Sequence, residues 1–134
     1  MATILRIKQF GDSLFEHSGI DFQFNNQVPE ENTISLDLNT RRHLLMIFKE
    51  AMNNCLKYSE ASEVRFITFL GEDEYTIQLT DNGLGFDPKN LARVNGLENM
   101  KSRAQESGAS LEIEGIPGMG TSVIFHQKMP QKGN

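Results

Sequence analysis

Two neighbouring segments alternate apolar and polar residues, and this alternation constrains the fold more than any other feature. The segments are VRFITFL (64–70) and YTIQLTD (75–81), and only GEDE (71–74) separates them. A period of two is typical of a strand with one covered face, and a short polar link predicts a hairpin. The covered face of the second strand would carry its odd-numbered residues, namely Tyr75, Ile77, Leu79 and Asp81. The chain therefore needs a second layer to cover this sheet.

Helical periodicity elsewhere supplies that layer. Helices are predicted over 3–17, over 40–58 with Asn39 or Thr40 as its cap, and over 96–107. The remaining strands are predicted at 20–24, 33–38, 110–115 and 121–127. Five or six strands, mostly linked as hairpins, with a few helices indicate an α+β fold, in which helices cover one face of an antiparallel or mixed sheet.

The composition limits the classes of function. A chain of 134 residues with a net charge of −5 suggests one domain and makes a nucleic-acid backbone an unsuitable partner. The single cysteine, Cys55, is interpreted as a buried structural thiol. The longest apolar run, LLMIF (44–48), is too short to cross a bilayer, and the N-terminus has no signal-peptide pattern. We therefore expect a cytoplasmic domain without membrane contact.

The helix predicted over 40–58 carries the first candidate site. Glu50, Asn54 and Lys57 follow an i, i+4, i+7 spacing and would share one face, with Asn53 beside them. A solvated face explains the glutamate and the lysine, but two asparagines inside a helix are unfavourable. An amide oxygen near a lysine would suit Mg²⁺ bound to a polyphosphate, because Mg²⁺ takes oxygen ligands and shares the rest with phosphates.

The stretch TDNGLGFDP (80–88) raises the second candidate. Its simplest interpretation is a turn, with Asp81 bonded to the local backbone. However, the strand register points Asp81 toward the helix layer, where a carboxylate needs a hydrogen-bond partner. That partner could be a ligand donor such as an adenine amino group, and Gly83 and Gly85 would let a flat ring approach the backbone.

Two further segments could contact phosphates. A helix opening at Gly96 and Leu97 would present free N–H groups to an anion. The preceding DPKNLARVN (87–95) is interpreted as a surface loop or one helical turn begun by Asp87-Pro88, or as a flexible cover over phosphates in which Lys89 or Arg93 supplies positive charge.

Four segments in this order resemble the ATP-binding domain of the GHKL superfamily (gyrase, Hsp90, histidine kinase and MutL). FKEAMNNCLKYS (48–59) is similar to its N box, and DNGLGF (81–86) to its G1 box. NGLENMKSRAQESGASLEIEG (95–115) is similar to the G2 region, and PGMGTSV (117–123) to the closing G-x-G-T. The likeness covers roughly 20–127 and is greatest to the catalytic domain of sensor histidine kinases with a very short ATP lid. It implies a two-layer α/β sandwich of the Bergerat type with a mixed sheet.

The resemblance implies roles for the N-box residues. Asn54 matches the asparagine that coordinates Mg²⁺, Lys57 the lysine that faces the phosphates, and Tyr58 a ring beside the nucleotide. Glu50 matches a water-activating base in the ATPases of the superfamily, and in a kinase it is expected to support the metal or its water.

The resemblance also implies how the base is held. Asp81 matches the aspartate that reads the adenine amino group, and Thr121 matches a threonine that contacts the adenine side with it. Gly83 and Gly85 match the G1 glycines under the base.

The G2 region departs from the family pattern. Gly96 and Leu97 match the start of the G2 helix near the phosphates, but Val94 stands where the family often has a first glycine. We expect a stiffer lid hinge and weaker nucleotide affinity from this change.

The phosphoacceptor half of such kinases has no counterpart in this sequence. None of His17, His43 and His126 is followed by an acidic residue as the acceptor histidine is. The resemblance thus implies an N-terminal helix over 1–18 that could connect to a dimerisation domain, a catalytic domain over 19–128 and a frayed tail over 129–134. Its partners would be ATP, that histidine-containing domain and a response regulator, and the isolated chain would be a monomer.

Two alternatives remain open. An anti-sigma-factor serine kinase has the same fold and is naturally one small domain. A non-catalytic nucleotide-binding module is the other.

Overall fold

The computed structural model describes residues 2–28, 36–85 and 91–128, and it gives only the backbone of 2 and of 91–95. The described elements in chain order are α1 (Ala2–Phe15), β1 (Asp21–Asn26), α2 (Leu38–Asn54), the π-helix η1 (Cys55–Ser59), β2 (Glu63–Leu70), β3 (Glu74–Asp81), α3 (Leu91–Glu106), β4 (Ser110–Ile116) and β5 (Gly120–Lys128). No helix in these ranges is long and apolar enough to span a membrane.

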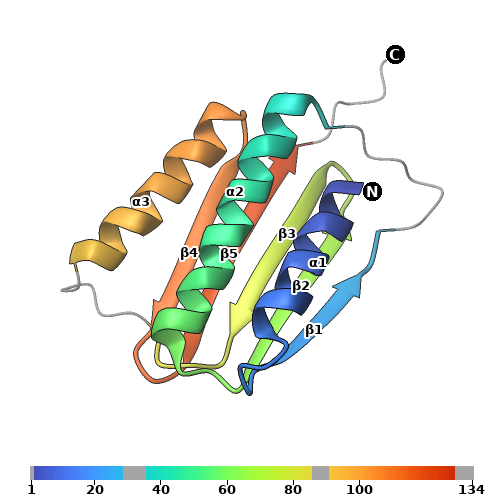
Figure 1. Cartoon of the computed structure of the whole chain (residues 1–134). Coiled ribbons are helices and arrows are strands. Elements are labelled where there is room, and N and C mark those ends of the chain that lie inside the picture. Colours follow the sequence, from blue (N-terminus) through green and yellow to red (C-terminus); the bar gives the residue numbers. More distant parts are fainter. Residues whose placement is uncertain (1, 29–35, 86–90, 129–134) are drawn as a thin grey trace, which may run out of the picture.

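The strands form one sheet in the order β1-β2-β3-β5-β4. β1 runs parallel to β2, and every other neighbouring pair is antiparallel, so the sheet is mixed. The helices α1, α2 and α3 lie side by side over one face of this sheet (Figure 1). The predicted two-layer α+β fold is confirmed.

The core lies between the helix layer and the sheet. Tyr75, Ile77 and Leu79 are fully or almost fully buried, and Asp81 is 4% exposed, as the alternation in β3 predicts. Each helix contributes its predicted apolar stripe to the same core, including Ile7 of α1, Phe48 of α2 and Met100 of α3. Burial of this apolar surface is the main force that holds the two layers together.

The start of α2 differs from the prediction. A strand over 33–38 is wrong for its last three residues, because 36–37 are irregular and Leu38 already belongs to α2; residues 33–35 lie outside the described ranges. The N-cap is Asp37 rather than Asn39 or Thr40. Its Oδ1 accepts the backbone N–H of Thr40 at 2.7 Å, a bond that neither predicted cap makes.

The end of the second helix also differs. The α-helix stops at Asn54 and continues as the π-turn η1, in which the Ser59 hydroxyl donates back to the carbonyl of Cys55. Glu60 then adopts a left-handed conformation and ends the segment. A π-turn advances less per residue around the axis, so Lys57 does not continue the straight face predicted with Glu50 and Asn54.

The third helix begins earlier than predicted. α3 starts at Leu91, five residues before Gly96, and Gly96 lies inside it. The prediction relied on glycine as a boundary signal, but a glycine within a helix costs only about 1 kcal/mol, which the burial of Leu97, Met100 and Ala104 can offset. The predicted end is nearly correct, because α3 ends at Glu106.

Candidate functional site

Asp81 ends β3 as a carboxylate facing the helix layer. Its Oδ1 accepts the backbone N–H of Gly83 at 2.9 Å and that of Thr121 at 3.3 Å. Its Oδ2 lies 3.4 Å from Sγ of Cys55, which donates to it. The hydrogen bond from Gly83 is the local turn contact that is expected if TDNGLGFDP is only a turn. The bonds to Thr121 and Cys55 tie the same carboxylate to β5 and to the end of the second helix.

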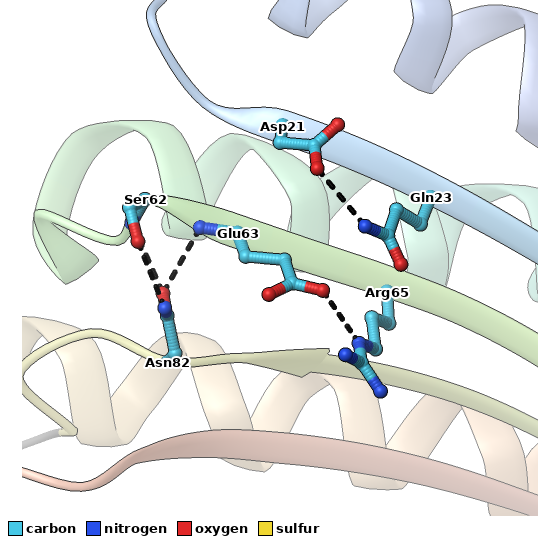
Figure 2. A network of polar contacts seen from close by, with 6 residues as sticks. All are labelled: Asp21, Gln23, Ser62, Glu63, Arg65 and Asn82. Atoms are coloured by element: carbon cyan, nitrogen blue, oxygen red, sulfur yellow. Dashed lines mark hydrogen bonds and ion pairs between the residues drawn. The ribbon is translucent and has the colours of Figure 1, made fainter.

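Asn82, the residue after Asp81, has a structural role. Its Oδ1 accepts the backbone N–H groups of Ser62 and Glu63, each at 3.0 Å, and its Nδ2 donates to the Ser62 hydroxyl at 2.9 Å (Figure 2). The side chain therefore fastens the loop after β3 to the start of β2. On the same side of the sheet, Arg65 pairs with Glu63 at 2.6 Å (Figure 2).

The glycines after Asp81 allow segments of backbone to approach each other closely. A Cβ on Gly83 would lie 2.1 Å from the carbonyl oxygen of Ser59, and one on Gly85 would lie 2.3 Å from that of Ile116. Gly85 also has a left-handed φ of +74°. The N–H of Leu84 donates to the Ser59 carbonyl at 2.7 Å. Protein backbone, rather than a ligand ring, thus already accounts for both glycines.

A pocket opens between the two layers at the end of β3. Its lining comes from α2, η1, β3, α3 and β5 and consists of Ala51, Asn54, Cys55, Leu79, Asp81, Leu97, Met100, Thr121 and Val123. Mostly apolar walls with a few polar groups have the chemistry of a small-molecule site, around a cavity of about 10 Å³. The pocket brings together four of the predicted site residues from distant segments, namely Asn54, Asp81, Leu97 and Thr121.

Thr121 supplies an unpartnered polar atom in this pocket. It faces Asp81 across the β3–β5 ladder, is 5% exposed, and lies on the same face as Val123 and Phe125. Its Oγ1 is buried and has no hydrogen-bond partner among the residues that the structure describes. Buried hydroxyls are normally paired, so this one points to a ligand or a water that would satisfy it.

The two asparagines of α2 differ in their surroundings. Nδ2 of Asn53 donates to the carbonyl of Lys49 at 3.0 Å, so this amide is bonded to its own helix. Asn54 is half-buried, lines the pocket, and makes no side-chain hydrogen bond to another described residue. The described ranges hold no cluster of three or more His, Cys, Asp or Glu suited to a metal. One amide oxygen fits Mg²⁺ only if phosphates and water complete the shell.

A second hollow adjoins the first between α2 and α3. Its lining is Met46, Glu50, Gly96, Asn99, Met100 and Arg103, and Met100 lines both hollows. Glu50 thus lies one helical turn from Asn54, in the neighbouring hollow. The Gly96 N–H is inside α3 rather than at a helix start, which removes the reason for a phosphate site at that point.

Four predicted residues lie elsewhere or are not described. Lys57 and Tyr58 are exposed on η1 and do not line either hollow. Lys89 lies outside the described residues, and of Arg93 only the helical backbone is described.

Comparison with known proteins places this geometry in a family. The model of the histidine kinase-, DNA gyrase B- and HSP90-like ATPases matches residues 39–131. The chain belongs to this family. The predicted resemblance and the prediction of an ATP-binding domain of the histidine kinase type are thereby confirmed.

Two relatives illustrate the similarity in sequence. The sensor protein VraS of Staphylococcus aureus is 37% identical over 82 residues, which are 60% of this chain and 24% of that protein. VraS of Staphylococcus epidermidis is 37% identical over 93 residues, which are 69% of this chain and 27% of that protein. The chain therefore spans about a quarter of the length of these relatives.

Solved structures support the fold. The histidine kinase domain of a blue-light activated histidine kinase from Erythrobacter litoralis superposes with a TM-score of 0.73 at 17% identity. The match covers 97% of this chain and 62% of that one. A second structure of this kinase gives a TM-score of 0.67 at 18% identity, covering 96% of this chain and 44% of that one.

Sequence reasoning missed part of the pocket lining. Cys55 was interpreted only as a structural thiol, yet it lines the pocket and donates to Asp81. Its position directly after Asn54 was the available signal, but the apolar stripe of the helix explained it equally well. Met100 and Val123 were missed for the same reason.

Two of the three histidines contact acidic residues of neighbouring elements. Nε2 of His43 lies 3.5 Å from Glu106 at the end of α3. His126 on β5 lies between Glu74 and Glu112, with 3.7 Å to the second. These contacts agree with structural roles and do not resemble an exposed phosphoacceptor.

Proposed function

We propose that this chain binds Mg-ATP as the catalytic domain of a sensor histidine kinase and donates the γ-phosphate to a histidine on a separate dimerisation domain. A response regulator would receive the phosphoryl group next. The observation that carries the proposal is the pocket in which the buried Asp81 carboxylate and the unpaired Thr121 hydroxyl lie together, close to the amide of Asn54.

The residues that line the pocket match the hydrogen-bonding groups and the flat ring of adenine. Asp81 can accept a hydrogen bond from the exocyclic amino group, and the Thr121 hydroxyl can donate, directly or through water, to a neighbouring ring nitrogen. Leu79, Met100 and Val123 provide apolar walls for the flat ring. Guanine presents a carbonyl where adenine has the amino group, so it would place an acceptor against the carboxylate.

The phosphates would extend from this pocket toward α2 and α3. Asn54 would hold Mg²⁺ through its amide oxygen, and Glu50 would support the metal or its water from the neighbouring hollow. Lys57 and either Lys89 or Arg93 would supply positive charge, and Tyr58 would lie beside the nucleotide. Bound Mg²⁺ neutralises phosphate charge, which is the main requirement of phosphoryl transfer besides positioning.

The transfer itself needs a nucleophile from the partner domain. An imidazole nitrogen forms a bond to the γ-phosphorus while the bond from the β,γ-bridging oxygen breaks, so ADP leaves and the ring loses a proton. The residues of this chain hold the nucleotide and exclude water. The isolated chain should therefore bind nucleotide with little turnover.

Titration calorimetry with ADP, with and without Mg²⁺, tests the proposal. Asp81→Asn should weaken ADP binding roughly tenfold to a hundredfold, since a hydrogen bond to a charged group is worth about 1.5–3 kcal/mol. Asn54→Ala should remove mainly the gain in affinity that Mg²⁺ provides. Asp73→Asn, on the exposed β2–β3 turn, is the control and should bind as the wild type does.

Two results would overturn the proposal or redirect it. Absence of binding at millimolar ADP would exclude both kinase functions. Phosphorylation of a serine on a partner protein by the isolated chain would instead favour the anti-sigma-factor kinase.

A further inference from the structure

Cys55 occupies an unusual position for a core thiol. It is the first residue of η1, is 5% exposed, and lines the pocket beside Asn54. Its Sγ lies 3.4 Å from Oδ2 of Asp81, whereas both backbone N–H groups that reach Asp81 bond to Oδ1. Among the described residues, the thiol is thus the donor that holds Oδ2.

This contact fixes the orientation of a carboxylate. The terminal torsion of an aspartate is broad and roughly two-fold, so donors on Oδ1 alone leave the plane of the group free to tilt. A third donor on Oδ2 fixes that plane and leaves the other lone pair of Oδ2 for the pocket. A thiol is a weak donor, so it can orient Oδ2 without competing strongly with a ligand.

A second, independent observation points to a ligand at this pocket. The Oγ1 of Thr121, a residue that lines the same pocket, is buried and has no partner within the described part of the chain, and the N–H of the same residue bonds to Asp81. A polar atom of this kind is satisfied when a molecule enters the pocket. The thiol, the carboxylate and the hydroxyl thus belong to residues that line one pocket.

We propose that Cys55 is a positioning residue for base recognition. Its S–H holds Asp81 so that the free lone pair of Oδ2 meets the amino group at C6 of a purine, and its sulfur lies against the bound base. This inference rests on the proposed function, because it specifies how the nucleotide pocket reads an amino group.

The test compares two ligands that differ in that amino group. ADP carries it, and purine riboside 5′-diphosphate has hydrogen in its place. Calorimetry on the wild type, Cys55→Ala and Cys55→Ser gives the affinity of each protein for both ligands. Cys55→Ala should weaken ADP binding by about threefold to tenfold, the equivalent of one net hydrogen bond, and weaken the purine riboside ligand clearly less, because that ligand loses only the contact of its ring with the sulfur.

Cys55→Ser restores a donor and should keep ADP binding within about twofold of the wild type. Equal weakening of both ligands in Cys55→Ala would show a merely structural thiol and overturn the inference. An unchanged affinity for ADP in that variant would also overturn it.

The wild-type protein provides a test that needs no substitution. Cys55 is the one cysteine of the chain, so a small thiol reagent reports this site without background from other thiols. Saturating ADP should slow the labelling of Cys55 at least tenfold, whereas an unchanged rate would overturn the placement of the thiol against the base. A wild type that binds no ADP would overturn the proposed function and this inference together, and the outcomes named above would overturn the inference alone.

Discussion

Single residues around Asp81 show that one motif serves two purposes. Asp81 faces the pocket, whereas Asn82 fastens the loop to β2 and Gly83 admits the carbonyl of Ser59. The sequence predicted bare backbone at Gly83 to make room for a ligand. The structure shows that the room is filled by the end of η1, so the glycine is needed for folding whether or not nucleotide binds.

Gly83→Ala should therefore destabilise the protein by about 2 kcal/mol or more. The new Cβ would lie 2.1 Å from backbone oxygen of Ser59, and backbone cannot swing aside as a flexible side chain can. Urea unfolding measures the change in the free energy of unfolding. Gly71→Ala is the matched control, because its Cβ would lie 3.5 Å from the nearest atom, and it should be neutral within about 0.5 kcal/mol. Equal stability of the two variants would contradict the close packing at Ser59.

At the scale of the elements, the start of α2 shows how far the local sequence determines where a helix begins. The sequence DLNT offers three residues suited to an N-cap, Asp37, Asn39 and Thr40, and the structure selects the first. Asn39 and Thr40 already lie inside α2, which begins at Leu38, so neither can be the residue that precedes the helix. The backbone N–H of Thr40, followed by its hydroxyl, holds the pKa of Asp37 below the ordinary value of 3.8.

This cap makes a pH-dependent contribution to stability. Because the pKa of Asp37 is lowered in the folded protein, the contribution is present above pH 3.8 and is lost as the pH falls through the folded value. Asp37→Ala should lower the midpoint temperature of unfolding at neutral pH. The difference from the wild type should shrink in acid.

Asp37→Asn is the matched variant, since asparagine also caps helices well but does not titrate. It should stay close to the wild type at neutral pH and show no loss of capping in acid. Thermal unfolding followed by circular dichroism at several pH values measures both variants. A gap between wild type and Asp37→Ala that persists unchanged in acid would contradict the assignment of the cap.

At the scale of the whole molecule, the two faces of the sheet differ. The three helices cover one face (Figure 1), and polar side chains such as Arg65, Glu63 and Gln23 lie on the other (Figure 2). Two neighbouring residues on β5 differ in burial accordingly. Phe125 is fully buried toward the helices, whereas Ile124 is half-buried on the open face. The pocket requires this arrangement, since its walls come from both layers.

Substitutions at this pair should separate the two faces. Phe125→Ala should cost about 3–5 kcal/mol of unfolding free energy, because it leaves a cavity in the core. Ile124→Ala should cost about 1 kcal/mol, because that face is already accessible to water. Urea unfolding measures both, and similar losses would contradict a sheet that is covered on one face only.

The periodic segments of the chain determined most of the fold. These segments are buried mainly on one face. This burial produces the alternation in β2 and β3 and the apolar stripes of α1, α2 and α3, which can be recognised in short stretches of sequence. Four ordered motifs identified the family and the cluster of Asn54, Asp81 and Thr121. These residues were predictable because each lies at or next to an end of a strongly periodic element.

Only the tertiary structure decided the rest. The π-turn of η1, the early start of α3 at Leu91 and the partner of Gly83 depend on contacts between segments distant in the chain, which local propensity does not record. The second role of Cys55 depends in the same way on a carboxylate 26 positions away. A stripe of apolar residues indicates which side chains are buried, but the packing of the two layers determines which atoms each buried side chain contacts.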